Sequence, residues 1–156
     1  MAKPANLFVP ASFTACTNST AEVEMGSVTI PAYFLRSPYK LGISYAVQTP
    51  STNSSDTFVP RVKVNSIVAA TLGAHDVVNN EVIDGQAEGM FIDGKLHVRS
   101  LSASSAVATL GGVHLVDQAV DTNADVVIKL TGQWSVANAG NNAVAKEFIV
   151  SLQPLD

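Results

Sequence analysis

Strict alternation between apolar and polar residues limits the fold of this chain more than any other feature. Between residues 126 and 134, the side chains Val126, Ile128, Leu130 and Trp134 alternate with Lys129, Thr131 and Gln133. Because successive side chains of a strand point to opposite faces, this pattern predicts a half-buried strand with Trp134 in the core. The same period predicts strands around residues 61–65, 95–99 and 148–152, and residues 21–30, 41–49, 66–72 and 106–115 are further candidates.

Short polar turns separate these runs, and the chain has almost no helical periodicity apart from one possible turn at residues 31–36. Several short strands joined by turns predict an antiparallel β-sandwich or barrel. Asp93-Gly94 has the chemistry of a two-residue hairpin turn, but it is also compatible with a bulge in one long strand. We favour the bulge, because a hairpin would leave its first arm short and glycine-bearing.

The 156 residues fit one domain, and only the N-terminal segment is expected to lie outside its core. Residues 1–18 hold Pro4 and Pro10 with the spaced aromatic residues Phe8 and Phe13. This composition predicts an extended N-terminal arm followed by a β-sandwich domain over residues 19–156. An arm of this kind drapes over a neighbour, so we expect Phe8 and Phe13 to anchor it on a partner.

Charge and composition exclude several classes of partner. The net charge is −4 and only 14% of the residues are charged, so counterion-driven binding of nucleic acid is not expected. Basic residues such as Arg36, Lys40, Arg61 and Lys63 are dispersed, with few aromatic residues between them. No run of about 18 apolar residues is present, so no membrane span is predicted. The single Cys16 and a start without a secretory pattern predict synthesis in a reducing cytoplasm.

No constellation of residues indicates catalysis, a cofactor or a metal. His75, His97 and His114 lack the spacing of zinc ligands, so no metal site is predicted. The acidic residues between 121 and 125 match only the first half of a calcium loop and read as a polar turn. Asp76, Glu81, Asp84 and Glu88 could supply the carboxylate pair of a glycosidase, but a solvated loop is the favoured interpretation.

The order of the segments resembles a family of small structural proteins of tailed bacteriophages. The resemblance is carried by Ser27-Val-Thr-Ile-Pro-Ala-Tyr-Phe-Leu, by Asp125-Val-Val-Ile-Lys-Leu-Thr-Gly-Gln-Trp-Ser with the Ala/Asn turn after it, and by Glu147-Phe-Ile-Val. Residues 95–102 are similar to the central strand of that family. The resemblance covers residues 27–152, whereas residues 1–18 and 73–85 depart from it.

This resemblance implies a jelly roll, often a homotrimer, that acts as a capsid decoration or cement protein. The expected partner is the major capsid protein, the expected location is the capsid surface of the virion, and no enzymatic activity is expected. A component of head fibres or tails remains an alternative, as does a carbohydrate-binding jelly-roll module. Sugar sites of such modules usually use an exposed aromatic residue, and the parity of Trp134 predicts that it is buried. An enzyme of the cupin or glycosidase type is a third class, but the sequence lacks the paired histidines and glutamate of a cupin.

Overall fold

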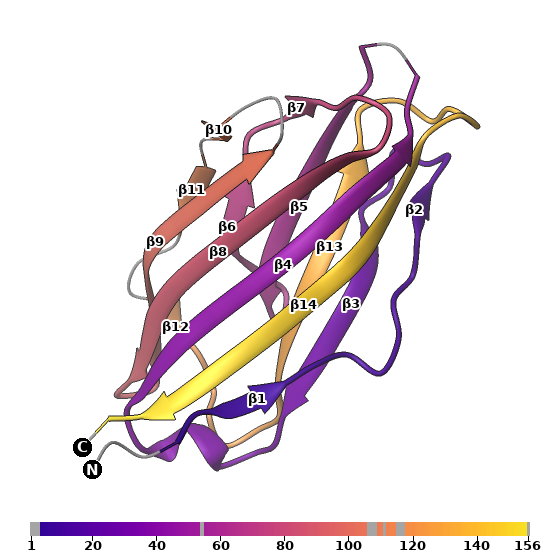
Figure 1. The fold of residues 1–156 in the computed structure, drawn as a ribbon. Coiled ribbons are helices and arrows are strands. Elements are labelled where there is room, and N and C mark those ends of the chain that lie inside the picture. Colours follow the sequence, from indigo (N-terminus) through magenta and orange to yellow (C-terminus); the bar gives the residue numbers. More distant parts are fainter. Residues whose placement is uncertain (1–3, 54, 106–108, 111, 115–117, 156) are drawn as a thin grey trace.

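A computed structural model describes residues 4–53, 55–105, 109–110, 112–114 and 118–155 of the chain. Two β-sheets pack face to face, and every strand pairing among these residues is antiparallel (Figure 1). The predicted antiparallel β-sandwich of jelly-roll type is therefore confirmed. Within the described residues, no helix has both the length and the apolar character that crossing a membrane requires.

Long central strands and short edge strands make up the two sheets. The eight-stranded sheet has the order β1 (Asn6–Phe8), β14 (Asn142–Pro154), β4 (Tyr39–Ser51), β8 (Glu81–Ile92), β9 (Lys95–Ser105) and β10 (Thr109–Leu110), with β2 (Cys16–Thr17) on β14 and β12 (Gln118–Ala119) on β9. The six-stranded sheet has the order β11 (Gly112–His114), β6 (Ile67–Leu72), β5 (Thr57–Val64), β13 (Val126–Trp134) and β3 (Val23–Ile30), with β7 (His75–Asp76) on β5. One 3₁₀ turn, η1 (Phe34–Arg36), lies within the segment for which a helical turn is predicted.

The period-two pattern correctly predicts which side chains face the core. Trp134 is 1% exposed, and its ring packs against Phe58 at a centroid distance of 5.0 Å. The indole N–H donates to the carbonyl of Cys16 at 2.9 Å, which satisfies its polar atom inside the core. The odd positions of β13, which alternate with this buried row, lie on the outward face of the six-stranded sheet.

The candidate strand at residues 106–115 is divided between the two sheets. Its described parts are β10, which pairs with β9, and β11, which pairs with β6. The rest of this candidate strand lies outside the described residues.

Asp93-Gly94 forms a hairpin turn, so the predicted bulge is wrong. β8 and β9 pair on either side of these two residues, both of which have positive φ, at 51° and 69°. Positive φ at both central positions is the geometry that matches the twist of paired strands. The first arm is twelve residues long, and its glycine Gly89 is required there because a Cβ would lie 2.4 Å from the backbone carbonyl oxygen of His97 on the neighbouring strand.

The N-terminal segment runs along the edge of the sandwich, and a separate extended arm is not shown. Both β1 and β2 pair with β14, and Figure 1 shows this segment running past the side where β14 and β3 lie. The backbone N–H of Thr14 also donates to the carbonyl of Met25 on β3 at 2.9 Å. Residues 4–18 thus bond to both sheets, because the edges of β14 and β3 offer them backbone partners.

Candidate functional site

A polar depression of about 410 Å³ lies on the outward face of the six-stranded sheet. It is lined by Glu22, Glu24, Lys63, Asn65, Ser66, Val127, Lys129 and Thr131. Its volume falls within the range of roughly 300–1,000 Å³ that is usual for small-ligand sites. We call this surface the polar face, and we add to it the neighbouring residues Thr20, Arg61 and Gln133, which continue it along β13 and β5.

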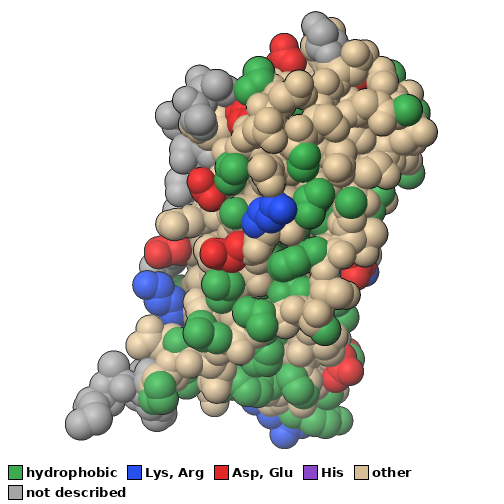
Figure 2. Space-filling model, turned by 45° about the vertical axis from the view of Figure 1, so that its right-hand side comes forward, with side chains coloured by type: hydrophobic (Ala, Val, Ile, Leu, Met, Phe, Trp, Pro, Cys, Tyr) green, Lys and Arg blue, Asp and Glu red, His purple; other side chains and the backbone are tan. Residues whose placement is uncertain are grey.

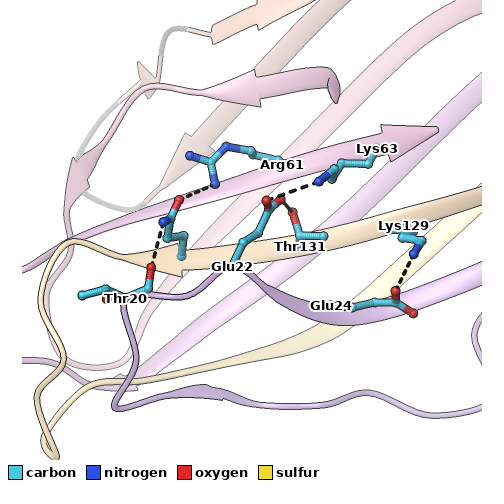
Figure 3. Close-up of polar contacts among 8 residues, drawn as sticks. Thr20, Glu22, Glu24, Arg61, Lys63, Lys129 and Thr131 are labelled. Carbon is cyan, nitrogen blue, oxygen red and sulfur yellow. Dashed lines mark hydrogen bonds and ion pairs between the residues drawn. The ribbon is translucent and has the colours of Figure 1, made fainter. Parts of the chain in front are cut away.

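Strand register brings the basic side chains of the polar face together. Lys129 of β13 lies directly opposite Lys63 of β5, and Thr131 lies directly opposite Arg61. Directly opposite residues of antiparallel strands have Cβ atoms about 5 Å apart. Lys129 therefore shares one small area of the surface with Arg61 and Lys63, which are far from it in the sequence (Figure 3).

Glu22, which precedes β3, reaches over β13 and joins two of these strands. One carboxylate oxygen accepts a hydrogen bond from the hydroxyl of Thr131 at 2.5 Å, and the other accepts one from the ammonium of Lys63 at 3.3 Å. Burial disfavours the charged carboxylate, but these hydrogen bonds and the charges of Lys63 and Arg61 outweigh it and hold the pKa of Glu22 below its usual value. Glu22 is therefore ionised in the folded chain at neutral pH.

A second ion pair, between Glu24 and Lys129, lies beside the first. The Nζ–Oε2 distance is 2.9 Å, and the side chains are 44% and 32% exposed. The hydrogen bond from Lys129 is the main cause that lowers the pKa of Glu24, with a further contribution from Ser27. Each lysine of the cross-strand pair thus contacts one carboxylate.

Arg61 and Gln133 extend the hydrogen bonding toward the segment before β3. Arg61 donates from Nη1 to the side-chain carbonyl of Gln133 at 2.9 Å, and the amide of Gln133 donates to the backbone carbonyl of Thr20 at 2.8 Å. Figure 3 shows these contacts in line with those of Glu22 and Glu24. Side chains of three adjacent strands are therefore held in place before any ligand arrives.

The predicted partner contacts Phe8 and Phe13 lie away from the polar face and pack on their own chain. Phe8 meets Phe34 edge-on with a ring-centroid distance of 5.7 Å. Phe13 is 38% exposed, and its ring covers Gly26 so closely that a Cβ there would lie 2.8 Å from the ring. Their role as anchors on a partner stays a prediction.

The acidic segment predicted as a solvated loop contains a buried carboxylate, so that interpretation is wrong for Glu81. The side chain of Glu81 is fully buried, accepts a hydrogen bond from the backbone N–H of Val78 at 2.8 Å and contacts His75 Nε2 at 2.7 Å. Burial opposes its ionisation, yet hydrogen bonds from Ser105, Val78 and His75 lower its pKa. These donors stabilise a charge that the sequence pattern places in solvent.

The two aspartates of the calcium-loop candidate each accept a hydrogen bond from the backbone. Asp121 accepts from the backbone N–H of Asn123 at 2.9 Å, and Asp125 accepts from that of Ala32 at 2.8 Å. Across the described residues, no three or more His, Cys, Asp or Glu side chains gather closely enough to hold a metal ion. The side chain of His114 lies outside the described residues.

Sequence reasoning did not identify the polar face as a site. The signal available was the odd positions of the strand at residues 126–134, which carry Lys129, Thr131 and Gln133. Alternation predicts that they face outward, but it says nothing of the strand that lies beside them. Lys63 and Arg61, read in the sequence as dispersed, meet them only through register.

Comparison with known proteins finds similarity among solved structures alone, because no family model and no curated protein matches the chain. One solved structure is the polysaccharide lyase family 18 protein aly-SJ02 r-CATD, at 9% identity over 96% of this chain and 85% of that one, with a TM-score of 0.33. Another is the alginate lyase from Alteromonas sp. 272, at 10% identity over 96% of this chain and 84% of that one, with a TM-score of 0.32.

Two predictions made from the sequence are corrected by this comparison. The solved structures are named as lyases of polysaccharides, which contradicts both the prediction of a capsid decoration or cement protein and the prediction that the chain is not an enzyme. The resemblance to phage proteins rested on strand and turn patterns, and such patterns recur in jelly rolls of unrelated function. The likeness to the lyases is one of fold, so a function has to be argued from the surface of this chain.

Proposed function

We propose that this chain is a carbohydrate-active jelly-roll protein that binds an oligosaccharide along the polar face. The observation that carries the proposal is the depression itself, whose lining combines donors and acceptors on an open sheet surface. Lysine ammonium groups donate, glutamate carboxylates accept, and the amide of Asn65 and the hydroxyl of Ser66 do both. Sugar hydroxyl groups also donate and accept, so this mixture matches them better than a surface of one kind.

The polar face is also preorganised. Thr131 is only 4% exposed and fixes Glu22, which in turn holds the ammonium of Lys63. A ligand that meets side chains already fixed by their neighbours loses less conformational entropy on binding than one that must order them. The row from Lys129 to Gln133 follows the length of β13, which suits an extended ligand.

Aromatic stacking plays no part in this proposal. Trp134 is buried against Phe58, and the lining of the depression contains no aromatic side chain. Val127 is the apolar member of the lining and can contact the C–H face of a sugar ring. We therefore expect binding that is mainly polar and of modest affinity.

The proposal is tested by measuring binding of the full chain to dextran, laminarin, xylan, polygalacturonate, alginate and carrageenan oligosaccharides by calorimetry. The double variant Lys63→Ala/Lys129→Ala is expected to lose binding, because it removes two donors of the polar face. Lys146→Ala, an exposed lysine on β14 of the other sheet, is the matched control and should bind like the natural chain. Failure to bind any of the six, or equal binding by the double variant, would contradict the proposal.

The same mixtures are followed by size-exclusion chromatography for shortening of the saccharide. Shortening that disappears in the double variant would add a cleavage reaction to the polar face. Binding without shortening would assign a binding role to this surface.

A further inference from the structure

The cross-strand pair of Lys63 and Lys129 is the least expected feature of the polar face. Like charges directly opposite one another on neighbouring strands are destabilising. Both side chains are nevertheless outward-facing and only partly exposed, at 22% and 32%. A surface selected only for stability has many residues that would serve better at either position.

The two glutamates reduce this repulsion and leave an excess of positive charge. Each contacts one lysine, whereas Arg61 donates to Gln133, which is neutral. The three cations Arg61, Lys63 and Lys129 therefore exceed the two carboxylates by one, in a chain whose net charge is −4. The polar face is more positive than the chain that carries it.

The two glutamates are not held equally. Glu22 accepts a hydrogen bond from the buried hydroxyl of Thr131 and is 30% exposed, whereas Glu24 accepts one from Ser27 and is 44% exposed. An ammonium group has three donors, and contact with one carboxylate oxygen engages one of them. An incoming anion can therefore add to the lysine pair and displace Glu24 more readily than Glu22.

From this arrangement we infer that the oligosaccharide is anionic and that one of its charged groups lies between the ammonium groups of Lys63 and Lys129. The inference rests on the proposed function and names its ligand class. A carboxylate and a sulfate share the chemistry that two ammonium groups recognise, namely several acceptor oxygens and a negative charge. Arg61 adds a third cation next to this point along β5.

The test compares each charged saccharide with a neutral form of the same chain. Polygalacturonate oligosaccharides are measured against their carboxyl-reduced form, and carrageenan oligosaccharides against their desulfated form. We expect the charged form to bind about two- to fivefold more tightly, the gain of one favourable charge contact, and we expect added salt to weaken this preference. The pair that shows the preference identifies the anionic group.

Two single variants should change the affinity for the charged form in opposite directions. Lys129→Ala should abolish the preference for the charged form, because it should lower the affinity for the charged form more than the affinity for the neutral form. Glu24→Gln should raise affinity for the charged form, because it removes the competing carboxylate. Lys146→Ala, with the same loss of charge on the other sheet, should change neither, and thermal melting confirms that each variant is folded.

The outcomes separate this inference from the function that it refines. Equal binding of charged and neutral forms, or tighter binding of the neutral form, would overturn the inference and leave saccharide binding intact. Lower affinity of Glu24→Gln for the charged form would also overturn it. Absence of binding to every saccharide would overturn the inference together with the proposed function.

Discussion

The outward faces of the two sheets differ in how their polar side chains are supported. On the six-stranded sheet, the polar face joins residues of three adjacent strands through ion pairs and hydrogen bonds (Figure 3). On the eight-stranded sheet, a smaller depression of about 190 Å³ is lined by Gly42, Ile43, Ser44, Gln86, Ala87, Glu88, Ile149 and Ser151. Figure 2, turned toward the side of β14 and β2, shows mainly uncharged side chains and backbone with acidic and basic side chains scattered among them.

The two outward faces differ in how far their side chains are fixed by neighbouring side chains. On the eight-stranded sheet, Ser44 donates a hydrogen bond to Glu147 and Ser151 donates one to the carbonyl of Gly42. On the polar face, by contrast, Glu22 and Thr131 hold each other in one geometry, which is what a binding site requires. The polar face thus links side chains of three strands, whereas the two hydrogen bonds named for the other sheet each join one pair of residues.

A hydroxyl-to-carboxylate contact occurs on each face, and the two give the sharpest comparison. Thr131 donates to Glu22 where the hydroxyl is buried, and Ser44 donates to Glu147 at 2.9 Å where the contact is exposed. Thr131→Val should lower the free energy of unfolding by about 1–2 kcal/mol, because it leaves one oxygen of a partly buried carboxylate without its hydroxyl donor. Ser44→Ala should lower it by less than about 0.5 kcal/mol, because water replaces the lost partner. Urea denaturation measures both, and equal losses would remove the distinction between the faces.

Acid should weaken the polar face through its two glutamates. The pKa values of Glu22 and Glu24 both lie below the ordinary 4.5, so each carboxylate binds its proton less readily in the folded chain than in the unfolded one. Their stabilisation is complete above the unfolded pKa and is lost as the pH falls through the lowered folded values. The double variant Glu22→Gln/Glu24→Gln should therefore be less stable than the natural chain at about pH 6, and the gap should narrow at about pH 3. A difference in stability that is the same at both pH values would contradict the lowered pKa values of the two glutamates.

The sequence predicts the framework of both faces but not their chemistry. Alternation identified the strand that becomes β13 and the burial of Trp134, because period two follows directly from strand geometry. Register between strands distant in the chain is set by the packing of the whole sheet, so the meeting of Lys63 with Lys129 could not be read from either segment.

Two further features of the structure could not be predicted from the sequence, for different reasons. Glu22 precedes its strand, where no apolar–polar alternation indicates which way the side chain points. Its partner Thr131 is 109 residues away. Glu81 lies in a stretch rich in Asn and Gly, and its burial depends on donors supplied by His75 and Val78. In both cases tertiary contacts decide the environment of the charge, and local composition does not report them.

Single-charge variants on the polar face should have smaller effects on stability, and their order is informative. Glu24→Gln leaves Lys129 facing Lys63 with one carboxylate fewer, so we expect a loss of at most about 0.5 kcal/mol in the free energy of unfolding after solvent screening. Lys63→Ala loses the contact with Glu22 but relieves the lysine pair, so its effect should be close to zero. Denaturation at low and high salt measures both, since screening should shrink the difference between them. A larger loss for Lys63→Ala than for Glu24→Gln would show that the lysine pair carries no repulsion.

The smallest effect is expected on the eight-stranded face, at Gly42. A Cβ at this position would lie 2.5 Å from the hydroxyl oxygen of Ser151, a side chain that can rotate away. Rotation gives up the hydrogen bond of 3.3 Å from that hydroxyl to the carbonyl of Gly42, whereas alanine gains roughly 0.5–1 kcal/mol over glycine in a strand. Because the two terms offset each other, Gly42→Ala should change the free energy of unfolding by less than about 0.5 kcal/mol and leave saccharide binding unaltered. Ser151→Ala isolates the hydrogen bond, and a loss of saccharide binding in either variant would move the binding surface to this sheet.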